Sequence, residues 1–136
     1  MFHLLIAEST KSFVGTQESH RLLRGLIGRT FAHAEMVRAS KAFSEGADGL
    51  PATLRALEGA SVVPHDLTFV AEALVKLQAE RQRADYDVRS GFTRKQVLGI
   101  VSLAQRATQA WERAREQPAA RLYLLSLFAW NRIPKE

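Results

Sequence analysis

The chain has 136 residues, which fits a single domain over residues 1-136. Its 46% hydrophobic and 24% charged residues are typical of a globular protein, and the absence of cysteine excludes disulfides, thiolate metal sites and cysteine nucleophiles. The net charge of +5 permits attraction to nucleic acid, but the basic residues are spread along the chain, so charge alone identifies no partner.

The chain begins with an apolar segment that has neither the basic start nor the cleavage site of a signal peptide. We therefore expect a cytoplasmic protein. Residues Phe2 to Glu8 have a helical pattern, but no capping residue precedes them. We expect this first helix to be truncated, with Met1 as an internal methionine.

A long helix is predicted over residues 16-43, because apolar side chains recur along one face of it. These side chains are Leu23, Ile27, Phe31, Ala34 and Val37. Two glycines in the polar run 44-49 end that helix. Pro51 then suits the first turn of a short helix through Leu57.

The next predicted helix runs from about Asp66 to Arg83 and carries an apolar stripe that ends in an arginine. The apolar members are Leu67, Val70, Leu74 and Leu77. Arg81 is the next position of the stripe, so we expect its side chain to point toward the core. A buried guanidinium needs an acceptor, and Asp85 lies one helical turn later.

The clearest helix start in the sequence follows Gly91. Thr93 and Gln96 have the spacing of a capping box, and Phe92 and Val97 that of a hydrophobic staple across it. One apolar stripe then continues along the predicted helix: Val97, Ile100, Val101, Ala104, Ala107, Trp111 and Ala114.

The last predicted helix opens at Pro118 and continues to about Trp130, before Pro134 blocks its extension. Its apolar residues cover the helix nearly all round, more than one bundle face can bury. They are Leu122, Leu124, Leu125, Leu127, Phe128 and Trp130. We therefore expect a subunit interface here, in a homodimer. The run is too short for the roughly 20 residues of a membrane span, so we expect no membrane association.

No segment alternates apolar and polar residues as a strand does, so the predicted fold class is all-α, an antiparallel up-and-down helical bundle. Three segments, residues 2-8, 28-36 and 77-87, resemble in order the bacterial HEPN-like helical-bundle family. The most specific is the last, which contains Ala84-Asp85-Tyr86-Asp87. The resemblance implies an HEPN-like bundle, a homodimer, and association with RNA-targeting toxins, defence systems or nucleotidyltransferase-type partner proteins.

Active ribonucleases of that family carry an arginine followed, after four to six residues, by a histidine. No histidine stands at that distance after Arg81 or Arg83. The resemblance therefore implies a noncatalytic or degenerate module associated with RNA or a nucleotide, in a defence or toxin-antitoxin system. A ribonuclease toxin with noncanonical residues, and a protein-interaction module without a ligand, are the alternatives.

Two groups of residues are candidates for contact with a phosphate or nucleotide. Arg81, Arg83, Asp85 and Tyr86 could line a groove, or Arg81 and Asp85 could form a structural clamp at the end of a helix. The second group is Arg29 and His33, which share a helix face and could bind phosphate, transfer a proton or simply hydrogen-bond within the core.

No metal or cofactor is predicted. The glutamate and histidine pairs of ferritin-like metal sites are missing, the four histidines are scattered, and no glycine-rich phosphate loop occurs.

Overall fold

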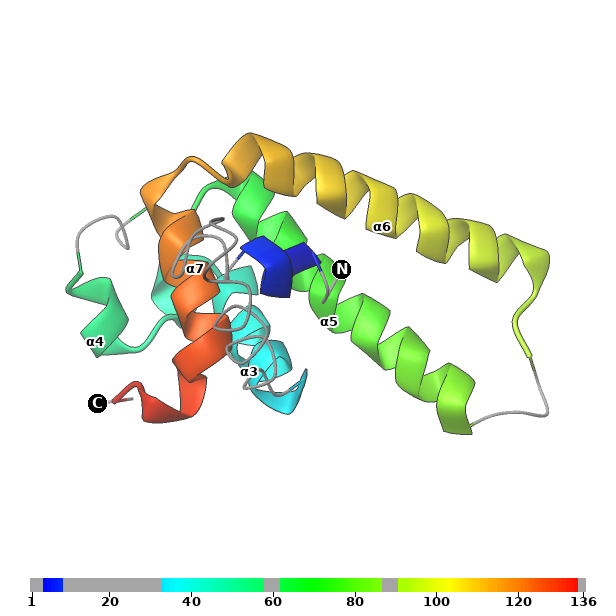
Figure 1. Ribbon diagram of the computed structural model, residues 1–136, viewed down its shortest axis with the longest axis horizontal. Helices are drawn as coiled ribbons and strands as arrows, with labels where there is room; N and C mark the ends of the chain where they lie inside the picture. The colour runs from blue at the N-terminus through cyan, green and yellow to red at the C-terminus, as the bar shows by residue number, and fades with distance from the viewer. Residues whose placement is uncertain (1–3, 9–32, 58–61, 87–90, 135–136) are drawn as a thin grey trace, which may run out of the picture.

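The computed structural model describes residues 4-8, 33-57, 62-86 and 91-134. These residues form helices and connecting turns, with no strand among them, which confirms the predicted all-α class (Figure 1). The elements are α3 (His33–Ser44), the 3-10 helix η2 (Ala47–Gly49), α4 (Ala52–Arg55), α5 (His65–Tyr86), α6 (Arg94–Ala114), α7 (Pro118–Ala129) and the 3-10 helix η3 (Trp130–Arg132). Residues 4-8 are also helical.

The predicted helix boundaries agree with the structure where a local signal in the sequence, such as a capping box, marks the boundary. The Thr93 hydroxyl accepts a hydrogen bond from the Gln96 amide at 3.1 Å, and the Gln96 side-chain oxygen accepts one from the Thr93 amide at 2.8 Å. This confirms the predicted capping box at the start of α6. Of the long helix predicted over 16-43, the part before His33 lies outside the described residues.

The core forms where α3, the first half of α5, the end of α6 and α7 meet. Its largest fully buried side chains include Leu5, Met36, Phe43, Leu67, Leu74, Trp111, Tyr123 and Leu127. The Phe43 and Tyr123 rings pack with their centroids 5.0 Å apart. The Tyr123 hydroxyl and the Ser40 hydroxyl form a buried hydrogen bond of 2.8 Å, while burial raises the pKa of the tyrosine. Both hydroxyls are therefore neutral and mutually satisfied.

The apolar residues of α7 lie mostly inside this core, which corrects the expectation that they form excess surface. Leu124, Leu127 and Trp130 are buried, Phe128 is half-buried, and Leu125 is 37% exposed. The cause is the position of α7, which packs against α3 (Figure 1). Core residues from other segments also surround α7. The surface from which a subunit interface was predicted is thus used within one copy of the chain.

Polar contacts fasten the helix ends around the core. Arg113 near the end of α6 donates two hydrogen bonds to Asp66 at the start of α5, at 3.0 and 3.2 Å. Arg115 lies 3.2 Å from the carboxylate of Glu8, which holds the helical residues 4-8 against the same end of α6. Each contact joins segments far apart in sequence, so together they hold the start of α5, the end of α6 and residues 4-8 against one another.

The Asp66 carboxylate is expected to stabilise the fold at neutral pH but not in acid. The hydrogen bond from Arg113 lowers the pKa of Asp66. The contact therefore stabilises the fold above the ordinary carboxyl pKa of about 3.9 and loses its effect as pH falls through the lowered value. Asp66→Asn should reduce Tm slightly at neutral pH, and the two Tm values should converge in acid. Calorimetry at several pH values, with the exposed Asp48→Asn as control, checks this.

Two helices, α5 and α6, extend beyond the core as a hairpin (Figure 1). We call residues 77-86 and 91-103 the arm. On α5, Leu74 is fully buried, Leu77 is half-buried and Arg81 is exposed. The expectation that Arg81 points into the core is therefore wrong. The stripe itself continues, but the far half of α5 extends away from α7 and from residues 4-8 (Figure 1).

The first half of α6 lies in the arm, and its apolar stripe is buried only in the second half. Ala107, Trp111 and Ala114 are buried. By contrast, Val97 is 45% exposed and Val101 is 47% exposed. The stripe predicted from the sequence thus divides into a packed end and an uncovered end.

Candidate functional site

The predicted site residues do not gather into one described cavity. Arg81 is exposed, so the clamp that would have buried its charge is wrong in that respect. Arg83 is also exposed, and its Nη1 donates to Glu80 Oε2 at 3.3 Å while the guanidinium lies 4.9 Å from the centre of the Phe92 ring. The positive charge of Arg83 is thus partly engaged within the arm.

The remaining predicted contacts cannot be followed in the described side chains. Arg29 lies outside the described residues, and so do the side chains of His33, Asp85 and Tyr86, although helices α3 and α5 include those three positions. Pairing between Arg81 and Asp85, and between Arg29 and His33, stays a prediction.

A groove between α3 and α5 has the composition expected of a site for an anion. Its volume is about 460 Å³. Ala34, Val37, Arg38 and Lys41 line it from α3, and Val75, Gln78, Ala79 and Gln82 line it from α5. Two basic residues and two glutamines therefore belong to the lining, and none of the described lining residues is acidic. We call it the α3–α5 groove.

One of the two cations of this groove is held in place and the other is available. Arg38 Nη2 donates to Asn131 Oδ1 at 3.2 Å, and Asn131 in turn donates to the Glu35 carboxylate. Lys41, one turn further along α3, is exposed and forms no ion pair with a described residue. An arginine held by an amide, beside an ammonium group that pairs with no described acid, suits the binding of phosphate oxygens.

The amide of Gln78 adds a second feature of a binding site. Its Oε1 atom is buried and receives no hydrogen bond among the described residues. A buried acceptor without a donor costs about 1–3 kcal/mol, so such atoms are rare in folded proteins. Because Gln78 lines the groove, rotation of its amide toward the groove would let a ligand N–H or O–H group satisfy this oxygen.

The α3–α5 groove also shows that His33 and Arg81, which belong to the two predicted groups of site residues, lie on neighbouring turns of α3 and α5. Ala34 and Gln82 both line it, so the first turn of α3, which contains His33, lies beside the turn of α5 that contains Arg81. Sequence reasoning placed His33 and Arg81 in separate candidate sites. It missed Arg38, Lys41, Gln78 and Gln82, because the only signal was a pair of polar residues one turn apart on each helix.

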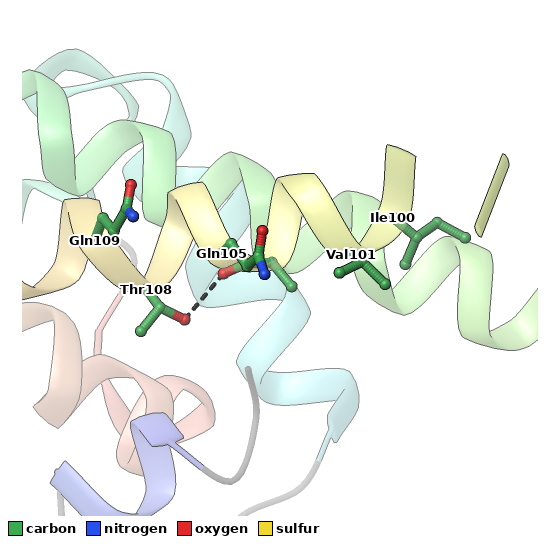
Figure 2. A pocket seen from close by; sticks show the side chains of 6 residues that line it. Ile100, Val101, Gln105, Thr108 and Gln109 are labelled. Carbon is green, nitrogen blue, oxygen red and sulfur yellow. Dashed lines mark hydrogen bonds between the residues drawn. The ribbon is translucent and has the colours of Figure 1, made fainter. Parts of the chain in front are cut away.

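The other grooves of the described residues suit an anion less well. Between α5 and α6, a groove of about 480 Å³ contains Lys76 and Arg83, but Glu80 lies in it and pairs with Arg83. A hollow of about 640 Å³ along α6 is lined only by uncharged residues, among them Ile100, Val101, Gln105 and Thr108 (Figure 2).

Within the described part of the chain, no three potential ligands of the His, Cys, Asp or Glu type gather to hold a metal ion. No described helix is both long and apolar enough to cross a bilayer. No protein-family model matches the chain, and comparison with curated proteins and with solved structures gives no match either.

Proposed function

We propose that the protein is a noncatalytic, HEPN-like module that binds RNA or a nucleotide in the α3–α5 groove. The observation that carries the proposal is the lining of this groove, where Arg38 and Lys41 stand beside two amides and no carboxylate occurs among the described lining residues. The resemblance of residues 77-87 to the HEPN-like family supports the choice of RNA or nucleotide as ligand, and of a defence or toxin-antitoxin system with a nucleotidyltransferase-type partner as the setting.

Each polar group of the groove has a counterpart in a nucleotide. Lys41 and Arg38 match the phosphate oxygens, whose neutralisation supplies most of the affinity of proteins for nucleic acid. The Gln78 oxygen, once its amide turns toward the groove, matches an amino or imino group on the edge of a base. Gln82, exposed at the end of the groove, can pair with a sugar hydroxyl or a second base edge.

The same lining favours binding over cleavage. Cleavage of RNA without a metal needs a group that takes a proton from the 2′-hydroxyl, and histidine or a carboxylate usually does this. None of the described residues that line the α3–α5 groove is His, Asp or Glu. The ribonuclease alternative would thus need a proton acceptor other than these described residues.

Removal of Lys41 is expected to weaken RNA binding and its salt dependence. Fluorescence anisotropy with a labelled, mixed-sequence single-stranded RNA should show affinity that falls with salt, and Lys41→Ala should reduce the slope of log K against log salt by about 1. Lys95→Ala, which removes an exposed lysine of the arm, is the matched control and should leave the slope unchanged. A parallel titration with a nucleoside monophosphate separates RNA from free nucleotide as the ligand.

A second variant tests the amide. Gln78→Leu removes the buried acceptor, so it should weaken binding while the Tm stays the same or rises. Absence of binding at low salt, or equal losses in Lys41→Ala and Lys95→Ala, would reject the groove as the site. Cleavage of the RNA that Arg81→Ala abolishes would support the ribonuclease alternative instead.

A further inference from the structure

An acid stands on α3 beside one of the two cations of the α3–α5 groove. Glu35 is half-buried and precedes Arg38 by three residues, a spacing at which a glutamate and an arginine of one helix can pair. Such a pair would cancel the charge that Arg38 brings to the groove. The ion pairs of the described residues do not include one between these two side chains. The structure therefore keeps the carboxylate and the guanidinium apart where the helix alone would let them meet.

The side chain of Asn131 separates the two charged groups. Asn131 belongs to η3, the 3-10 helix that follows α7 and contacts α3. Its Oδ1 atom accepts a hydrogen bond from Arg38 Nη2 at 3.2 Å, and its Nδ2 group donates one to Glu35 Oε1. An amide side chain carries an acceptor and donors on one planar group, so it can serve a guanidinium and a carboxylate at once. An acid at this position would repel Glu35, and a base would repel Arg38.

Contacts on both sides of Asn131 hold it against α3. Trp130, the residue before it, is buried in the core. Ile133 packs against the same core, and its amide donates to the Trp130 carbonyl at 3.2 Å. The Thr53 hydroxyl of α4 donates to the Pro134 carbonyl at 3.0 Å. The amide of Asn131 thus reaches its two partners from a fastened segment.

Arg38 is shared between this hydrogen-bond network and the groove. It lines the groove together with Lys41, whereas Glu35 and Asn131 do not belong to the described lining. The Arg38 side chain therefore stands at the border between the groove and η3. Asn131 uses only one of the several N–H donors of the guanidinium, so the others can still bind a phosphate oxygen.

We propose that Asn131 is a positioning residue of the α3–α5 groove. It occupies the Glu35 carboxylate and holds the Arg38 guanidinium away from it, so that the charge of Arg38 stays available to a phosphate. This inference rests on the proposed binding of RNA or a nucleotide in the groove. Without the amide, Glu35 would pair with Arg38, and the groove would lose the effect of one of its two cations while the fold stayed intact.

The salt dependence of RNA binding tests the proposal. With a labelled, mixed-sequence single-stranded RNA, Asn131→Ala should weaken binding and reduce the slope of log K against log salt by about 1, as the loss of one phosphate contact does. Addition of Glu35→Gln should restore most of the affinity, because a glutamine cannot neutralise Arg38. Thr53→Val removes another hydrogen bond of the same C-terminal segment, so it is the matched control and should leave the slope unchanged.

A double-mutant cycle separates this effect from the general gain on removing an acid. Glu35→Gln should raise the affinity by a larger factor in the Asn131→Ala background than in the native chain. In an Arg38→Ala background, Asn131→Ala should have no further effect. The proposal would be overturned by equal factors in the two backgrounds, or by a loss in Asn131→Ala that does not depend on Arg38. Asn131 would then act through the docking of η3 or by touching the RNA itself.

Nuclear magnetic resonance of the arginine side chains gives a measurement that needs no RNA. In a chain with ¹⁵N-labelled arginine, Glu35→Gln should shift the Arg38 Nε signal strongly in the Asn131→Ala background and little in the native chain, and Arg38→Ala assigns the signal. Equal shifts would overturn the proposal even where RNA binds. Absence of RNA binding by the native chain at low salt would instead reject the proposed function, and the spectra would still decide whether Asn131 keeps Glu35 from Arg38.

Discussion

Replacement of Trp111 by alanine is expected to lower the free energy of unfolding by about 3–5 kcal/mol. Trp111 is almost fully buried among α6, α5 and α7 residues of the core. Its indole Nε1 has no acceptor among the described residues, so the substitution removes packing and no hydrogen bond. The cavity left by an indole is too large for the neighbours to fill. Urea unfolding followed by circular dichroism measures the change.

The control for that measurement is an exposed large apolar residue elsewhere. Leu57 follows α4 and is exposed, so Leu57→Ala should change the free energy of unfolding by less than about 0.5 kcal/mol. Similar losses for Trp111→Ala and Leu57→Ala would contradict the position of the core. A reduced m value together with the loss would instead indicate that the variant no longer unfolds in one cooperative step.

Features that depend on a few consecutive residues could be predicted from the sequence. The capping box of Thr93 and Gln96 is one, because its two hydrogen bonds join residues three apart. Pro118 as the first residue of α7 is another. By contrast, the sequence predicts the end of α5 at about Arg83, whereas the helix ends at Tyr86, because no capping signal marks this boundary.

Burial could be predicted only in part, because helical spacing shows which side of a helix is apolar but not how far its neighbours extend. The stripe of α6 from Val97 to Ala114 is one pattern in the sequence, yet only its second half lies in the core. The apolar residues of α7 give the opposite case, since the core around that helix buries residues that one bundle face could not. The positions of neighbouring helices decide both outcomes.

The α3–α5 groove could not be predicted for a related reason. Arg38 and Lys41 are ordinary exposed basic residues in the sequence, and Gln78 and Gln82 are ordinary polar residues of a helix. They become a candidate site for an anion only because α3 and α5 pack side by side. The sequence does predict which residues lie one turn apart on each helix, but the pairing of the two helices comes from tertiary packing.

The second large expected effect is a difference in the free energy of unfolding between variants at Leu74 and Arg81, two positions of the apolar stripe on α5. Leu74→Ala should lower the free energy of unfolding by about 2–5 kcal/mol, since its side chain is fully buried. Arg81→Ala should change it by less than about 0.5 kcal/mol, although Arg81 occupies the same stripe two turns later, because its side chain is exposed. Urea unfolding of both variants beside the native chain measures the difference.

The result for Arg81 also decides how its role in binding can be tested. If Arg81 were buried and paired, Arg81→Ala would leave the charge of its partner buried alone and lower the free energy of unfolding by about 3–5 kcal/mol. Such a loss would contradict the exposed position found in the arm. An unchanged stability makes the variant a clean probe, because any loss of RNA binding would then report on contact with the ligand rather than on folding. Since the turn of α5 that carries Arg81 lies beside the first turn of α3, a phosphate chain that leaves the α3–α5 groove at Gln82 would pass close to this turn. A moderate loss of affinity in Arg81→Ala, smaller than that in Lys41→Ala, is therefore the expected result.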